Sequence, residues 1–136
     1  MSPNAKMMCG ILLITVPTIQ YGGYFLLQVL SGKMDKMQLT TFQKSMFRAG
    51  HAHAGVLIIL SLIAQILIDH ASLANGLEWL VRIGFPLSAI LVSGGFFAAA
   101  GGKGVTAPNK YIGILYIGIF TLAASLLTLG IGLLRG

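Results

Sequence analysis

The sequence is short of charge. Only 9% of its 136 residues are charged, whereas a soluble domain carries about 25%. This deficit excludes an ordinary soluble domain. Together with the 56% share of hydrophobic residues and a mean hydropathy of +0.88, it indicates an integral membrane protein small enough to form one domain.

Cysteine and acidic residues are scarce as well. Cys9 is the only cysteine, which excludes an internal disulfide and a cysteine-based metal site. Nine basic residues against three acidic ones give a net charge of +6. In a membrane protein such an excess reports topology more often than nucleic-acid binding. Because no glycine-rich phosphate loop is present either, we expect no nucleic-acid partner.

The chain does contain four long apolar segments, at about 9–30, 41–68, 77–100 and 111–134. At 1.5 Å per residue each is long enough to cross about 30 Å of hydrocarbon. Glycine, asparagine, aspartate or proline in each short connection ends the preceding helix. We therefore predict an all-α membrane protein, a single domain with four transmembrane helices in an up-down-up-down bundle within the lipid bilayer.

Basic residues are unevenly divided between the two sides of this bundle. Six lie on the side of the first and third loops: Lys33, Lys36, Lys44, Arg48, Lys103 and Lys110. Three lie on the other side: Lys6, Arg82 and Arg135. The positive-inside rule places the richer side in the cytoplasm and both termini outside, with a bacterial inner membrane as the expected location. Dual topology is the alternative.

Polar side chains recur along the first two predicted helices. Gln20, Tyr24 and Gln28 are spaced by four, which places them on one stripe of the first helix. On the second helix, at 100° per residue, Gln65 and Asp69 fall on a common face. Since bundles in lipid are held partly by interhelical hydrogen bonds, we predict that these five residues form a polar core.

The stretch RAGHAHAG, residues 48 to 55, carries the ionisable residues of the second helix. Ionisable residues inside a span mark a functional site by default, although Arg48 can also extend to the lipid headgroups. His51 shares the face of Arg48, Gln65 and Asp69. His53 falls about 160° away from His51, so a regular helix cannot chelate one metal with both histidines. Small residues surround both imidazoles and leave space for a planar cofactor or a close partner helix.

The same stretch resembles the Arg/His-rich helix starts of haem-copper-oxidase-like and nitric-oxide-response membrane proteins. The resemblance implies that His51 or His53 is a ligand of haem b or of a metal ion, with Arg48 beside a propionate. Those families supply further histidines from other helices. Here the remaining histidine is His70. The haem would therefore be five-coordinate, or its second axial ligand would come from another residue type or from a second subunit. Within one chain, His51 is the residue we expect to act.

Three functions remain open. The first is a haem- or metal-binding membrane protein, a homo-oligomer or a subunit of a respiratory-type complex. The second is a small oligomeric proton or ion transport unit that uses the polar core, and the third is a non-catalytic accessory subunit. The whole chain is similar to small four-span bacterial membrane proteins, which implies no activity. Asp69, His70 and Glu78 offer a weaker metal site at the outer surface, where such residues are usually solvated.

Small residues recur at intervals of four at the end of the third predicted helix. Gly94, Ala98 and Gly102 form one such row, and Gly95 and Ala99 form a second. This spacing predicts close helix packing within the bundle. An oligomer seam or a flat surface for a macrocycle is the alternative.

Overall fold

The computed structural model describes the backbone of residues 1–136 and every side chain except that of Asp35. Its elements are α1 (Pro3–Leu30), the short 3-10 helix η1 (Asp35–Met37), α2 (Thr41–Ile68), α3 (Asn75–Ala99) and α4 (Ile112–Leu134). The described residues form no strand, and each of the four long helices is long and apolar enough to span a membrane. The predicted fold class is confirmed. The first helix begins six residues earlier than its predicted span.

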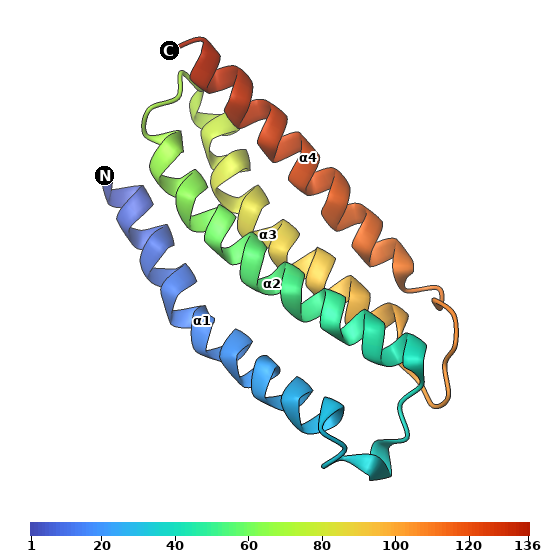
Figure 1. Ribbon diagram of the computed structural model, residues 1–136. Coiled ribbons are helices and arrows are strands. Elements are labelled where there is room, and N and C mark those ends of the chain that lie inside the picture. The colour runs from blue at the N-terminus through green and yellow to red at the C-terminus, as the bar shows by residue number, and fades with distance from the viewer.

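The four long helices run antiparallel to their neighbours along the chain (Figure 1). α3 packs against both α2 and α4, while α1 packs against α2 at the edge of the bundle (Figure 1). Both chain termini and the α2–α3 connection lie at one end, which we call the terminal end. The connections 31–40 and 100–111 lie at the other, which we call the loop end.

The start of α2 is fixed by a capping box. The Thr40 hydroxyl accepts from the Gln43 N–H at 3.1 Å, and the Gln43 side chain accepts from the Thr40 N–H at 3.1 Å. The buried Gln43 amide also donates to the carbonyls of Ala100 at 2.9 Å and Gly102 at 2.8 Å. Because these carbonyls follow the last turn of α3, one side chain joins the two helices at the loop end.

α3 and α4 cross closely at glycines. A Cβ built on Gly95 would lie 2.5 Å from the backbone nitrogen of Leu115, and one on Gly118 would lie 2.7 Å from that of Val92. No described atom lies within 4 Å of a Cβ built on Gly94, which is exposed. The predicted close packing therefore belongs to the row that contains Gly95, and Gly94 faces outward.

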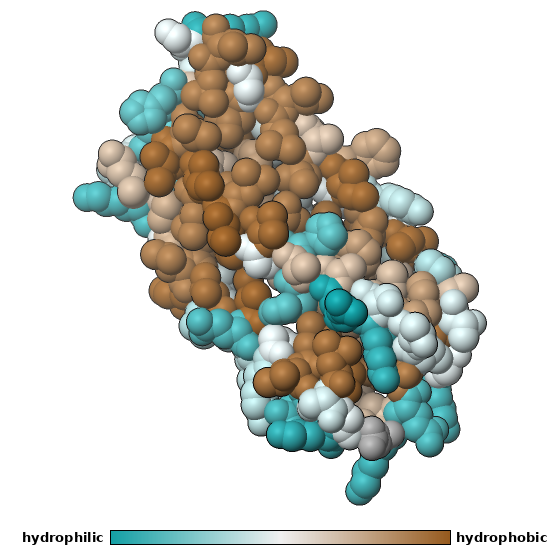
Figure 2. Space-filling model, in the orientation of Figure 1, coloured by the Kyte–Doolittle hydropathy of each residue, from teal (hydrophilic) through white to brown (hydrophobic). Residues whose placement is uncertain are grey.

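The apolar core lies among α2, α3 and α4. Its buried members are Leu57, Ala64, Ile68, Val81, Phe85, Ala89, Val92 and Leu129. Large apolar side chains also cover much of the outer surface, and hydrophilic ones gather toward the loop end (Figure 2). An apolar exterior of this extent is expected where lipid is the solvent.

Candidate functional sites

The polar face predicted for the second helix is divided between two separate places. Gln65 is buried and Asp69 is nearly so, and both lie at the terminal end of α2. His51 lies 14 residues before Gln65, roughly 21 Å along the helix axis. The two groups therefore belong to different sites, although they share one face of the predicted helix.

At the terminal end, a buried arginine that the sequence analysis did not single out lies at the centre of the polar contacts. Arg82 of α3 is 1% exposed. Its Nη2 is 2.7 Å from Asp69 Oδ1, its Nε is 2.8 Å from Glu78 Oε1, and its Nη1 donates to Gln65 Oε1 at 3.2 Å. We call the set Ser2, Gln65, Asp69, Glu78 and Arg82 the Arg82 cluster.

Pro86 explains why Gln65 belongs to the cluster. Proline has no N–H, so the Arg82 carbonyl one turn earlier lacks its helical donor. The Gln65 Nε2 supplies that donor at 2.9 Å. Gln65 thus accepts from the Arg82 guanidinium and donates to the Arg82 carbonyl. Glu78 four residues before Arg82, and Pro86 four residues after it, are the sequence signals that could have identified this site.

Asp69 links the start of α1 to the cluster. The Ser2 N–H donates to Asp69 Oδ2 at 2.6 Å, and the Ser2 hydroxyl donates to Oδ1 at 2.7 Å. Burial alone would raise the pKa of Asp69. The hydrogen bonds from Ser2 and Arg82 outweigh it and lower this pKa from 3.8 to about 2. The carboxylate is therefore ionised at neutral pH and holds the ends of α1, α2 and α3 together.

Both acidic residues of the alternative surface metal site are already paired. The carboxylates of Asp69 and Glu78 both bind Arg82, and His70 is exposed. Among the described residues no group of three histidine, cysteine or acidic side chains is arranged to hold a metal ion. The Arg82 cluster is a structural tie between helices.

The polar stripe of α1 does not face this cluster. Gln20 and Tyr24 are exposed, and Gln28 is half-buried. Gln20 does share a cleft of about 280 Å³ between α1 and α2 with His51. The predicted stripe thus lies mostly at the surface of the single chain, and one of its residues approaches the histidine.

His51 packs tightly against α1. A Cβ built on Gly23 would lie 3.1 Å from His51 Nε2, and one built on Gly22 would lie 3.5 Å from Nδ1. Both ring nitrogens therefore lie beside the glycine backbone of α1. A macrocycle on either nitrogen would require α1 to move away. This environment suits helix packing.

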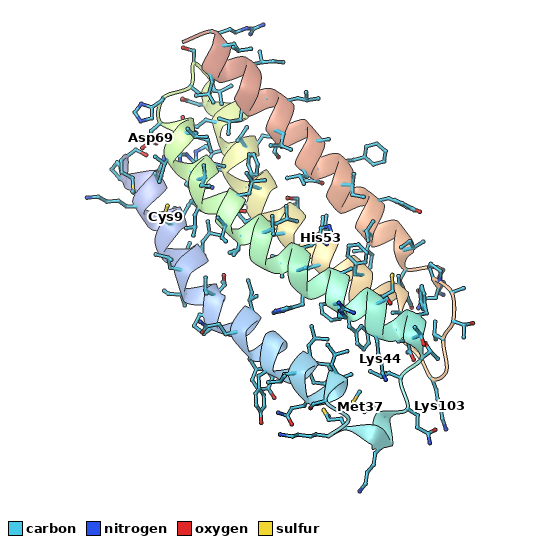
Figure 3. The ribbon with its side chains drawn as sticks, viewed as in Figure 1. Cys9, Met37, Lys44, His53, Asp69 and Lys103 are labelled. Carbon is cyan, nitrogen blue, oxygen red and sulfur yellow. The ribbon has the colours of Figure 1, made fainter. Side chains whose placement is uncertain are left out.

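His53 has a different environment, as its place on the predicted helix indicated. It is exposed, on the side of α2 away from α1 (Figure 3), and its ring centroid is 4.9 Å from that of Phe96. Its Nδ1 is 2.8 Å from the Ala49 carbonyl. Since a carbonyl only accepts, Nδ1 is the donor in this contact, and in the neutral imidazole the lone pair is on Nε2. Arg48 is also exposed, but it lies about 140° around the helix from His53.

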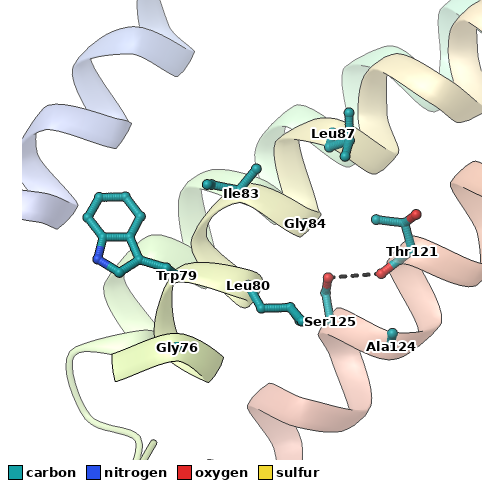
Figure 4. A pocket seen from close by; sticks show the side chains of 9 residues that line it. All are labelled: Gly76, Trp79, Leu80, Ile83, Gly84, Leu87, Thr121, Ala124 and Ser125. Atoms are coloured by element: carbon teal, nitrogen blue, oxygen red, sulfur yellow. Dashed lines mark hydrogen bonds between the residues drawn. The ribbon is translucent and has the colours of Figure 1, made fainter. Parts of the chain in front are cut away.

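A groove on the outer side of α3 and α4 has a volume of about 500 Å³ (Figure 4). Its two hydroxyls are satisfied within α4. Ser125 donates to the Thr121 carbonyl at 2.8 Å, and Thr121 donates to the Ile117 carbonyl at 2.8 Å. Gly84 of α3 lies directly against Ser125. This groove has the character of a lipid-facing helix crossing.

Fold and sites together define a small four-helix, multi-pass membrane protein with an ion-pair cluster at one end and an exposed imidazole partway along α2. Comparison with models of known protein families, with curated proteins and with solved structures finds no match to this chain.

Proposed function

We propose that this protein is a haem-binding subunit of the cell membrane in which His53 is an axial ligand of a haem b shared with a second copy of the chain. The observation that carries the proposal is the contact between His53 Nδ1 and the Ala49 carbonyl at 2.8 Å. Histidines that ligate metals commonly donate their other ring N–H in this way, which fixes the tautomer and the ring orientation. The proposal keeps the haem implied by the stretch RAGHAHAG and assigns it to His53 in place of His51.

The depth of His53 in the bilayer supports the proposal that a cofactor or a second subunit covers its side chain. His53 is the thirteenth residue of α2, roughly 18 Å from the start of a helix about 42 Å long. This position lies within about 30 Å of hydrocarbon if the helix spans the bilayer centrally. An exposed imidazole at that depth is costly in lipid. A cofactor or a second subunit would relieve the cost, and Phe96 supplies one apolar wall for it.

Haem fits this donor set better than a bare metal ion. The described residues offer no three-ligand group, but a porphyrin supplies four nitrogen ligands of its own and needs only axial ones from protein. Two copies related by a two-fold axis would present two His53 side chains to one iron. When bound, such a haem would transfer single electrons. The chain itself orients the imidazole through the Ala49 carbonyl and places Phe96 beside it.

The test is a visible absorption spectrum of the purified protein in detergent, before and after addition of haemin. We expect a Soret band that is lost in His53→Ala and retained in His51→Ala, because the His53 ring is exposed and oriented by the Ala49 carbonyl, whereas both ring nitrogens of His51 lie against α1. Both variants should keep the helical circular dichroism of the parent. A folded protein that remains colourless with excess haemin would contradict the proposal and favour the accessory-subunit alternative.

The transport alternative has less support. Gln65 and Asp69 are engaged by Arg82, so they are not free to continue a polar path from His51 toward the terminal end.

A further inference from the structure

A second cleft, of about 340 Å³, lies among α1, α2 and α3. Ser93 lines the part nearest the loop end, Thr18 and Ala54 lie near the midpoints of α1 and α2, and Ile11 and Ile58 lie on the terminal side of those midpoints. None of its described lining residues is charged. It is separate from the exposed face of His53, which lies on the other side of α2.

Ser93 is the unusual residue of this cleft. It is 7% exposed, and its hydroxyl is buried with no hydrogen-bond partner among the described atoms. The other buried serines each donate to a carbonyl one turn earlier in their own helix, at 2.7 to 2.8 Å: Ser61, Ser88 and Ser125. A buried polar group without a partner is costly. The lone hydroxyl in a cleft wall therefore indicates that something else satisfies it.

The direction and composition of the cleft restrict what that partner is. The buried hydroxyl of Ser93 lies at the loop-end side of the cleft, and the residues at the opposite side, Ile11, Leu12 and Ile58, are apolar. This is the polarity of an amphiphile whose head lies in the leaflet at the loop end. The absence of charge among the described lining residues disfavours an ionic headgroup. A volume of 340 Å³ is at the small end of ligand pockets, which suits one head and part of one tail.

We propose that this cleft binds an uncharged amphiphile from the leaflet at the loop end, with a carbonyl or hydroxyl oxygen hydrogen-bonded to Ser93 and the hydrocarbon directed to the bilayer centre. A quinone ring and a glyceride ester share this chemistry. The Thr15 and Thr18 hydroxyls already donate within α1, so Ser93 is the donor left for the ligand.

The experiment is isothermal titration calorimetry of the full chain in micelles with decyl benzoquinone and decanoyl glycerol as probes, and decyl phosphate as the charged control. We expect at least one neutral probe to bind and decyl phosphate not to bind. Ser93→Ala should weaken binding about tenfold, the effect of losing one hydrogen bond. Ser88→Ala is the matched control, because Ser88 already donates to the Phe85 carbonyl and should leave affinity unchanged.

Ala54→Leu provides a second variant that keeps Ser93 and fills the cleft. It should abolish binding of the neutral probe, whether or not Ser93→Ala folds. Binding of the quinone alone or of the glyceride alone identifies the source of the ligand. The proposal is overturned if neither neutral probe binds, if decyl phosphate binds equally well, or if a folded Ser93→Ala or Ala54→Leu variant binds like the parent. Loss of haem binding in His53→Ala is a separate result and does not enter this test.

Discussion

At the scale of single residues, the structure depends on a buried arginine whose hydrogen-bond partners lie in α2 and α3 and at the residue before α1. Arg82 contacts Glu78 within α3, Gln65 and Asp69 from α2, and Ser2 ahead of α1. A buried charge is tolerated only when it is paired and hydrogen-bonded. Arg82 meets that condition with two carboxylates, which is why it can occupy an apolar bundle.

Replacing Arg82 should therefore be strongly destabilising. Arg82→Gln leaves Asp69 and Glu78 without their cation, and the loss of one partner from a buried pair costs about 3–5 kcal/mol. The measurement is unfolding in mixed micelles titrated with SDS. The control is Arg135→Gln, which removes an exposed cation at the end of α4 that makes none of these contacts. Equal stabilities of the two variants would contradict this role.

The low pKa of Asp69 predicts acid sensitivity. The folded-state pKa is about 2 and the ordinary value is 3.8, so the ionised carboxylate stabilises the fold above pH 3.8, and this contribution disappears as the pH falls toward 2. Its full size is about 2 kcal/mol. Stability measured against pH should fall across this window in the parent and stay flatter in Asp69→Asn. If the stability of the parent and of Asp69→Asn changed with pH in the same way, the contacts from Ser2 and Arg82 would not stabilise the ionised carboxylate.

The residue scale is also where prediction from sequence was least complete. Burial of Gln65 follows from the helical period, and so does the separation of His51 from His53. The contact between Gln65 and Arg82 does not follow from the helical period, because Arg82 is distant along the chain and is expected among the basic residues at the terminal end. Gln20 and Tyr24 form a stripe in sequence, but only the position of α1 at the edge of the bundle shows that they are exposed.

At the scale of elements, the crossing of α3 and α4 depends on which row of small residues faces inward. The spacing of Gly94 and Gly95 predicts two rows, and either one could pack. The contact with α4 shows which row packs, because a Cβ built on Gly95 would lie only 2.5 Å from the backbone nitrogen of Leu115. That contact joins residues from two helices, so no pattern within α3 could reveal it.

Gly95→Ala and Gly94→Ala make a matched pair. Alanine at 95 must displace the α4 backbone, and overpacking of this kind costs about 1–3 kcal/mol. Alanine at 94 meets no described atom within 4 Å, and its better helix propensity should leave stability unchanged or slightly raised. SDS titration of both variants measures the difference. A Gly94→Ala variant as unstable as Gly95→Ala would mean that the outward row is an interface.

At the scale of the whole molecule, basic side chains are divided unevenly between the two ends of the bundle, which bears on the expected orientation. Arg82 is paired with two carboxylates, so the unpaired basic side chains at the terminal end are Lys6 and Arg135. Basic side chains are more numerous at the loop end, where Lys44 and Lys103 lie opposite Asp69 (Figure 3). The positive-inside rule counts lysine and arginine irrespective of their acidic partners, and this count favours the loop end in the cytoplasm.

Cysteine labelling tests this orientation. In a Cys9→Ser background, an impermeant maleimide should label Arg135→Cys in intact cells and label Lys103→Cys only after lysis. Both target positions are exposed at opposite ends of the bundle. Labelling of both variants in intact cells would indicate dual topology instead.

The haem-to-chain ratio tests the central claim most directly, because a haem between two His53 side chains requires a fixed stoichiometry. In a haemin titration of the detergent-solubilised protein, the Soret absorbance should reach its end point at one haem for two chains. His51→Ala should give the same end point, and His53→Ala should give no saturable signal. An end point unaffected by His53→Ala, or no saturable binding by the folded parent, would contradict the assignment of His53 as the ligand.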